Sequence, residues 1–223
     1  NTSTIPLSAL TANASAGFRK QCLITHFFNP PRHMRLLEIV SGPQTDAEAV
    51  AAISHFADVS LGKSIVTCKD RPGFIANRLG CFWLQAAIAE AITQGITVEE
   101  ADAVMARPFG IPKTGVFALA DLIGIDLLPH VNASLAAALE PQDLFHTVNV
   151  PLPLAQRMIA DGRTGRKGKG GFYRINRDAG KRMEALDLAS DIYRPVRTVA
   201  IANGDALLTD DGRLGRYARS VML

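Results

Sequence analysis

A histidine and a glutamate occupy two apolar runs of this sequence, where ionisable side chains are unusual. His26 lies in the run 22–28, and Glu38 has two aliphatic residues on each side. Burying either group in an apolar strand is costly without a partner, so we expect the imidazole and the carboxylate to meet. A carboxylate on one ring nitrogen makes the other more basic, which suits general acid–base catalysis. The competing interpretation is a core histidine beside a surface carboxylate at a strand end.

A metal site built from His26, His33 and Glu38 is a further alternative. His33 follows a Pro-Pro-Arg turn, and no HxH or HxxxH spacing places two imidazoles on one face. The ligand geometry that zinc requires is not encoded locally, so we predict no metal site.

Three uncharged polar residues are further candidates. Asn77 lies on a helix predicted to start near Gly73, among small and apolar neighbours, so its amide needs a partner. A helix–helix hydrogen bond and a contact with substrate explain this amide equally well. Ser3 suits a helix N-cap, and Asn29, which precedes a proline, suits a turn.

A basic, glycine-rich segment runs from Gly162 to Tyr173 and contains four cationic residues, Arg163, Arg166, Lys167 and Lys169. A flexible, solvated surface turn is the simplest interpretation of such a segment. The alternative is a loop that lies near an acidic phosphate of a cofactor.

Composition excludes several classes of protein. A chain of 223 residues with 48% hydrophobic residues is long enough and apolar enough to form a core. The 24 basic and 21 acidic residues nearly balance, so we expect no nucleic-acid partner. Cys22, Cys68 and Cys81 lie in apolar surroundings without a CxxC motif, which predicts free thiols in the cytoplasm. No run of about 18 apolar residues is present, so we expect no insertion into a membrane.

Residues 1–71 are predicted to form an α/β region. Apolar, β-branched and aromatic runs predict three strands, at 22–28, 36–41 and 64–68. A helix before the third strand is expected to begin with a capping box between Thr45 and Glu48 and to end at Gly62.

Residues 72–173 are predicted to form an all-helical domain that begins at Pro72-Gly73. Thr97 and Glu100 form a second predicted capping box, and further helical segments are expected at 115–123, 127–139 and 152–160. Residues 174–223 are predicted to be a linker and the start of a further segment, with a short hairpin near Asn203-Gly204 and a final helix too short to bury a face. The polar start at Asn1, without a methionine, predicts a fragment of a longer chain.

Six motifs in one order resemble the L-3-hydroxyacyl-CoA dehydrogenases of fatty-acid β-oxidation. These motifs are NTST, HFFNP, LLEIV, CKDRPGFIANRL, FGIPKTGVFALADLIGID and GRKGKGGFY. The resemblance implies an α/β remnant, the C-terminal part of a Rossmann-like NAD-binding domain, over residues 1–71. It also implies that the all-α domain after it shapes the acyl pocket and forms a homodimer.

The resemblance also implies residue roles. His26 would be the general acid/base on the 3-hydroxyl of an acyl-CoA substrate, and Glu38 would orient it. Ser3 and Asn77 would bond the reacting oxygen and the thioester region, and Ser3 and Asn29 would lie near the nicotinamide of NAD. The family's GxGxxG turn has no counterpart in these 223 residues, so we expect this chain to be inactive alone.

Two alternatives stay open beside this interpretation. One is the related 3-hydroxybutyryl-CoA dehydrogenase, and the other is a non-catalytic helical fragment that serves dimerisation or substrate binding. The segment INRDAGKRMEALDLASDIYRP is also similar to a segment of bacterial proteins in which the dehydrogenase is fused to an enoyl-CoA hydratase, which implies a multifunctional parent.

Overall fold

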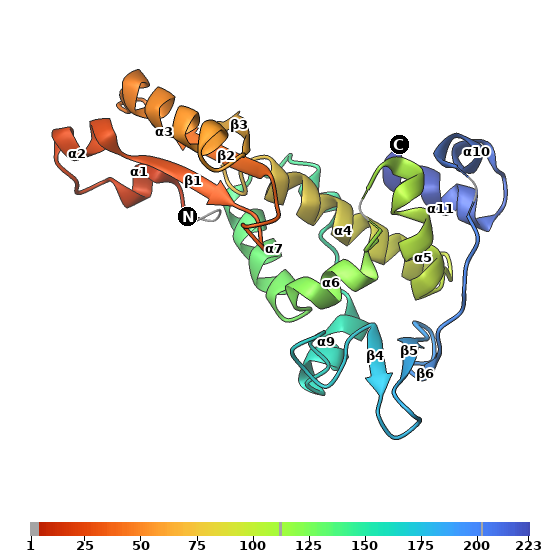
Figure 1. Cartoon of the computed structure of the whole chain (residues 1–223). Coiled ribbons are helices and arrows are strands. Elements are labelled where there is room, and N and C mark those ends of the chain that lie inside the picture. The colour runs from red at the N-terminus through yellow and green to blue at the C-terminus, as the bar shows by residue number, and fades with distance from the viewer. Residues whose placement is uncertain (1–4, 112, 202) are drawn as a thin grey trace. The chain divides into compact units, whose positions relative to one another are not determined.

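A computed structural model describes residues 5–111, 113–201 and 203–223 (Figure 1). The described residues form two compact units. The first runs to Gly80 and includes residues 137–139, and the second contains the remaining described residues. No described helix is both long and apolar enough to cross a bilayer.

A three-stranded sheet in the order β1-β2-β3 organises the first unit. β1 (Leu23–Phe27) runs antiparallel to β2 (Leu36–Ser41), and β3 (Ser64–Cys68) runs parallel to β2. Parallel neighbours need a crossover, which α3 (Ala47–Val59) provides; Figure 1 shows it in orange beside the sheet. The three strands predicted from apolar runs are therefore confirmed.

Both faces of this sheet are covered by apolar side chains. On one face Ile24, Val40 and Cys68 pack with Phe74 and with Leu7 of the short helix α1 (Leu7–Leu10). A second cluster joins Leu37 and Ile39 of β2 to Ala57 of α3. Because both faces are covered, four consecutive residues of β2 are buried, and its sequence shows no apolar–polar alternation.

The capping box predicted at Thr45 is wrong. The Thr45 hydroxyl accepts a hydrogen bond from the N–H of Gly42 at 2.9 Å and donates to the carbonyl of Cys22 at 2.8 Å. It therefore ties the turn after β2 to the residue before β1. Asp46 is the N-cap of α3 without a side-chain bond, and α3 ends at Val59, three residues before Gly62. A further short helix, α2 (Ala16–Gln21), precedes β1.

Helices dominate the second unit. The long helix α4 (Ala76–Thr93) begins in the first unit and continues into the second. It is followed by α5 (Val98–Val104), η1 (Arg107–Phe109), α6 (Phe117–Ile123), α7 (Leu127–Ala138), α8 (Phe145–Val148) and α9 (Pro153–Ala160). The capping box predicted at Thr97 is confirmed, since Thr97 Oγ1 accepts from the N–H of Glu100 while Glu100 Oε2 accepts from the N–H of Thr97.

The linker and the hairpin predicted after Tyr173 are wrong. β4 (Tyr173–Asn176), β5 (Arg182–Leu186) and β6 (Tyr193–Pro195) form an antiparallel sheet in that order. Asn203 caps α10 (Gly204–Thr209), because its side chain accepts from the N–H of Ala206 at 2.9 Å. Leu186 and Leu207 are buried in the main core of the unit.

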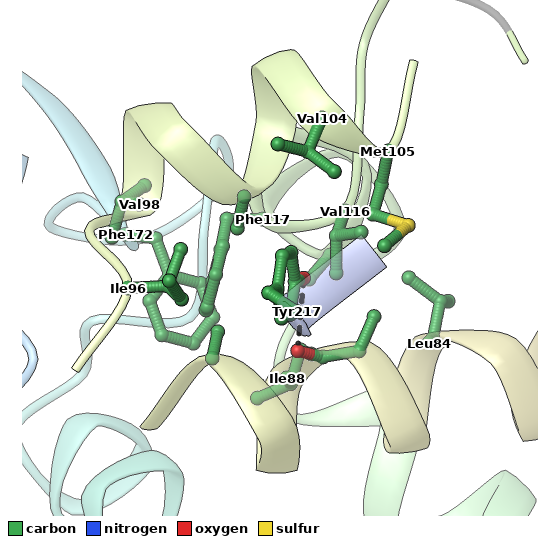
Figure 2. Packing of buried hydrophobic residues seen from close by; sticks show 14 of the residues in the cluster. Leu84, Ile88, Ile96, Val98, Val104, Met105, Val116, Phe117, Phe172 and Tyr217 are labelled. Atoms are coloured by element: carbon green, nitrogen blue, oxygen red, sulfur yellow. Dashed lines mark hydrogen bonds between the residues drawn. The ribbon is translucent and has the colours of Figure 1, made fainter. Parts of the chain in front are cut away.

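The last helix, α11 (Arg213–Met222), also buries a face, contrary to the prediction. Figure 2 shows Tyr217 among core residues from several helices. Its hydroxyl donates to the carbonyl of Ala87 at 3.1 Å, and its side chain is fully buried. The segment after residue 173 is therefore an integral part of this unit's core.

Candidate functional site

His26 and Glu38 are brought together by strand pairing in the first unit. The register of β1 and β2 places the two residues directly opposite each other. His26 Nδ1 lies 2.7 Å from Glu38 Oε2, and the residues are only 8% and 1% exposed. Directly opposed side chains on one face of a sheet are the closest cross-strand neighbours. The local fold therefore positions the imidazole and the carboxylate without any loop residue.

The second oxygen of Glu38 binds the beginning of α4. Glu38 Oε1 accepts hydrogen bonds from the N–H groups of Ile75 at 3.0 Å and Ala76 at 2.8 Å. The first N–H groups of a helix have no partner within the helix and attract an anion. Three N–H donors, one from His26 and two from the backbone, thus compensate for the burial of this carboxylate.

The partner of Nδ1 determines which nitrogen of His26 can react. A carboxylate accepts, so Nδ1 carries a hydrogen and the neutral ring leaves its lone pair on Nε2. Among the described residues, Nε2 has no hydrogen-bond partner. The rings of Phe28 and Phe74 stand edge-on to the imidazole, with centroids at 4.8 and 5.5 Å. His26 can therefore accept a proton at Nε2 beside apolar walls.

Cys68 lies beside this pair but is not a nucleophile. Burial and the neighbouring negative charge of Glu38 raise the pKa of the Cys68 thiol to about 11. The thiol therefore stays protonated at neutral pH, and only the thiolate is strongly nucleophilic. It serves the core of the first unit instead.

Lys63 fixes the connection between β1 and β2, a role that the sequence did not reveal. Its buried ammonium donates to the carbonyl of Met34 at 2.8 Å and to the carbonyl of Pro31. It also lies 5.9 Å from the centre of the Phe27 ring. A lone lysine before a strand carries no signal of such a bond, because the acceptors come from a loop about 30 residues earlier in the chain.

The remaining candidate residues differ in how exposed they are, and one of them lies outside the described residues. Asn77 is half-buried on α4, directly after Ala76, whose N–H binds Glu38. Asn29 is exposed two residues after the end of β1, and Ser3 lies outside the described residues. His33 is exposed, and no three His, Cys, Asp or Glu residues within the described ranges are grouped to hold a metal.

A hollow of about 290 Å³ lies within the second unit, between α4, α7 and the residues around α9. Its walls are mostly apolar, with a buried amide pair as the polar part. Asn132 donates to Gln85 at 3.0 Å, and Gln85 donates to the carbonyl of Val150 at 2.7 Å. No Asp, Glu, His, Lys or Arg residue lines this hollow, so its walls suit an apolar group.

Two buried carboxylates in the second unit are structural. Asp102 accepts from the N–H groups of Val116, Phe117 and Ala118 and from the Tyr173 hydroxyl, which joins the start of α6 to β4. Asp121 accepts from the N–H groups of Phe172 and Tyr173 at 2.8 Å. Burial raises the pKa of Asp102 to about 7 and that of Asp121 to about 6, against the opposing effect of these donors.

Comparisons with known proteins match both regions of the chain to one family. The family model of the 3-hydroxyacyl-CoA dehydrogenase NAD-binding domain matches residues 1–71. The model of the C-terminal domain of the same family matches residues 73–175. The matches therefore run through both the strand pair and the helical region.

Individual relatives carry related names. A putative fatty acid oxidation complex trifunctional enzyme of Rickettsia felis is 41% identical over 225 residues, which cover the whole chain and 31% of the relative. The solved structure of FadB2 from M. tuberculosis matches with a TM-score of 0.68 at 34% identity, over 79% of this chain and 59% of that one. For 3-hydroxybutyryl-CoA dehydrogenase from Escherichia coli, the TM-score is 0.66 at 29% identity, over 93% and 39%. The chain thus spans only part of the length of each of these proteins.

Proposed function

Since the chain belongs to the 3-hydroxyacyl-CoA dehydrogenase family, we propose that it supplies the acid–base pair of an NAD-dependent enzyme that oxidises L-3-hydroxyacyl-CoA to 3-ketoacyl-CoA in fatty-acid β-oxidation. The observation that carries this proposal is the buried contact of 2.7 Å between His26 and Glu38, with α4 held on the other carboxylate oxygen.

The proposed role of His26 follows from its free nitrogen. Nε2 takes the proton of the substrate's 3-hydroxyl as the C3–H bond breaks. The hydride acceptor would be NAD bound to the complete enzyme. Glu38 keeps the ring in the tautomer with hydrogen on Nδ1 and stabilises the imidazolium that forms. In the reverse reduction the imidazolium returns the proton to the carbonyl oxygen. Phe28 and Phe74 limit access of water to the imidazole.

Asn77, Ser3 and Asn29 have proposed positioning roles. Asn77 follows the two residues that bind Glu38, so an amide there is suited to bond the reacting oxygen or the thioester carbonyl. Ser3 is proposed to share that contact, and Asn29 with Ser3 to lie near the nicotinamide. These roles rest on the family motif and on the place of Asn29 and Asn77 in the first unit.

The NAD site is proposed to be incomplete in these residues. A mixed sheet of three strands and no GxGxxG turn supply no cradle for the pyrophosphate of a dinucleotide. We therefore propose that residues 1–71 are a remnant of the NAD-binding domain, followed by a helical domain from residue 72, and that the chain is inactive alone. Dimerisation through the helical domain and a cytoplasmic location belong to the same proposal.

Two alternative functions each have an observation in their favour. Preference for 3-hydroxybutyryl-CoA is supported by the name of the E. coli neighbour. A non-catalytic role in dimerisation or substrate binding is supported by the mostly apolar hollow of about 290 Å³, whose lining has no Asp, Glu, His, Lys or Arg. A dehydrogenase is favoured over the non-catalytic role because that role does not need the His26–Glu38 pair, whereas oxidation of 3-hydroxybutyryl-CoA would use the same pair.

The test is acetoacetyl-CoA-dependent oxidation of NADH, measured for this chain and for a longer chain that adds an upstream GxGxxG region. Activity only in the longer chain would support both the dehydrogenase activity and the incomplete NAD site. Activity in this chain alone would contradict the proposed incomplete NAD site. Absence of activity in a folded longer chain with acetoacetyl-CoA and with longer 3-ketoacyl-CoA substrates would favour the non-catalytic alternative.

A further inference from the structure

The basic, glycine-rich loop at 162–173 is folded, in contrast to the flexible turn expected from its sequence. Gly165 N donates to Gly170 O at 2.8 Å, Gly168 N to Gly165 O at 3.0 Å, and Lys169 N to Gly162 O at 2.9 Å. A Cβ on Gly165 would lie 2.4 Å from the carbonyl oxygen of Asp121, and one on Gly168 would lie 2.6 Å from that of Gly162. Glycine is therefore required at both positions, and the loop has one tight backbone path.

This path places cations around a large hollow in the second unit. The loop hollow, of about 1130 Å³, lies between the loop and strand β4, and its lining includes Arg166, Lys169, Arg174 and Arg177. Lys167 belongs to the same loop and is exposed, but it does not line the hollow. The fold of the loop therefore places Arg166 and Lys169 at the hollow and leaves Lys167, between them in the sequence, outside its lining.

The charges of the lining are only partly compensated. Arg174 donates to Glu184 at 2.8 Å. Within the described ranges, Arg166, Lys169 and Arg177 form no ion pair, and all three are exposed. Two carboxylates, Asp121 and Asp178, also line the hollow, and Asp121 already accepts two backbone N–H groups. The charge of Arg166 also acts on Asp121, so this cation is partly compensated, whereas Lys169 and Arg177 have no ion-pair partner among the described residues.

The rest of the lining defines what an anionic ligand must carry. Met183, Ile175 and the ring of Tyr173 form an apolar wall. Guanidinium groups bind phosphate oxygens in a bidentate manner, and a flat ring system suits an apolar or aromatic wall. A volume of about 1130 Å³ exceeds what an isolated phosphate needs. We propose that the loop hollow binds a nucleotide, with its phosphate groups on Arg166, Lys169 and Arg177 and its base against the apolar wall.

The experiment is calorimetric titration of the 223-residue chain with ADP, at low and at high salt. The test variant is Arg166→Gln with Lys169→Gln, and Lys167→Gln is the matched control from the same loop. The inference predicts that the double variant weakens ADP binding at least tenfold, that the control changes it less than twofold, and that salt weakens binding to the wild type. Adenosine, which lacks phosphate, should bind far more weakly than ADP.

Titration with CoA identifies the source of the nucleotide, and a further single variant replaces the double variant if that one does not fold. CoA that binds at least tenfold more tightly than ADP would assign the hollow to the nucleotide end of CoA, whereas equal affinity would assign it to a free nucleotide. Arg177→Gln, on the strand side of the hollow, repeats the test should the double variant unfold. No binding of ADP or CoA, an equal loss in the Lys167→Gln control, or adenosine binding as tight as ADP would overturn the inference. No turnover is measured, so the outcome is independent of the proposed dehydrogenase activity.

Discussion

Glu38 joins His26 to the first turn of α4. One carboxylate oxygen lies 2.7 Å from His26 Nδ1, and the other accepts the N–H groups of Ile75 and Ala76. The residue that orients the proposed base therefore also fixes the start of the helix that carries Asn77. A change at Glu38 should affect both the fold of the first unit and the proposed chemistry.

Replacing Glu38 should destabilise the first unit strongly. In Glu38→Ala, one buried donor on His26 and two partly buried backbone donors lose their acceptor, which should lower the free energy of unfolding by about 3–5 kcal/mol. Glu48→Ala removes an exposed carboxylate on α3 and should change it by less than about 0.5 kcal/mol. Urea denaturation of both variants measures the difference, and equal effects would show that the buried contacts of Glu38 do not matter.

The Asp102–Tyr173 hydrogen bond should make stability depend on pH. Burial raises the pKa of Asp102 from its usual 3.8 to about 7, so the folded state binds more protons than the unfolded state between these values. The contribution of Asp102 to stability is therefore fully present below about pH 4 and is lost as the pH rises towards 7. The Tyr173 hydroxyl opposes this loss, because it stabilises the carboxylate.

Tyr173→Phe should therefore cost more at pH 8 than at pH 4. We expect a loss of about 1 kcal/mol at the lower pH and about 2–3 kcal/mol at the higher, because a hydrogen bond to a charged acceptor is stronger. Tyr193→Phe is the control, since the Tyr193 hydroxyl donates at 2.6 Å to the carbonyl of Gly171, which does not titrate. A Tyr173→Phe cost that is the same at both pH values, as measured by denaturant unfolding, would contradict the assignment.

Arg194 should anchor strand β6 to helix α5 within the second unit. It donates to both oxygens of Glu99, at 2.6 and 2.9 Å, and Glu99 is only 6% exposed. Burial raises the pKa of Glu99, but the Arg194 guanidinium and the N–H of Arg197 lower it further, so the net pKa lies below its usual range. This stabilisation is therefore present at neutral pH and is lost as the pH falls through that lowered pKa.

Arg194→Met should lower the free energy of unfolding by about 3–5 kcal/mol, because it leaves a buried carboxylate without its charged partner. It should also expose the segment after Leu186 to limited proteolysis. Arg157→Met removes an exposed arginine that lies 3.5 Å from Asp191, and should cost less than about 1 kcal/mol. Unchanged protease resistance in Arg194→Met would argue against this role.

Two helical glycines should respond to alanine in opposite directions. A Cβ on Gly215 would lie 1.9 Å from the carbonyl oxygen of Asp210, so Gly215→Ala should cost about 1–3 kcal/mol or more. Apart from its chain neighbours and the nearby backbone of α4, no described atom lies within 4 Å of a Cβ placed on Gly80, so Gly80→Ala should stabilise by about 0.5–1 kcal/mol. Thermal unfolding of both variants checks the signs, and a stabilising Gly215→Ala would contradict the packing of α11.

Local patterns in the sequence predicted the strands of the first unit and one helix start in the second. The β-branched and aromatic runs located all three strands of the sheet, and a full capping box located the start of α5 at Thr97. Both signals act within a few residues, so they survive tertiary packing. The contact of His26 with Glu38 could be expected because burial demands a partner, although the register that brings them together was not visible.

Features set by distant residues were missed. Thr45 has the pattern of a cap, but its hydroxyl bonds to Cys22, 23 residues earlier. The sheet of β4, β5 and β6 has strands of four, five and three residues, too short to show a period, and its buried residues depend on contacts with the helices. Lys63 was missed for the same reason, since its acceptors lie in the loop before β2.

The most direct test of the account replaces His26 by glutamine in a longer chain that carries an upstream GxGxxG region. Single-turnover oxidation of NADH by acetoacetyl-CoA and the dissociation constant of acetoacetyl-CoA are measured for both proteins. We expect His26→Gln to slow the chemical step by about 10²–10⁴-fold and to leave the dissociation constant nearly unchanged, as for the loss of a positioned acid–base group. A folded His26→Gln variant that retains the wild-type rate would contradict the proposal that His26 transfers the proton.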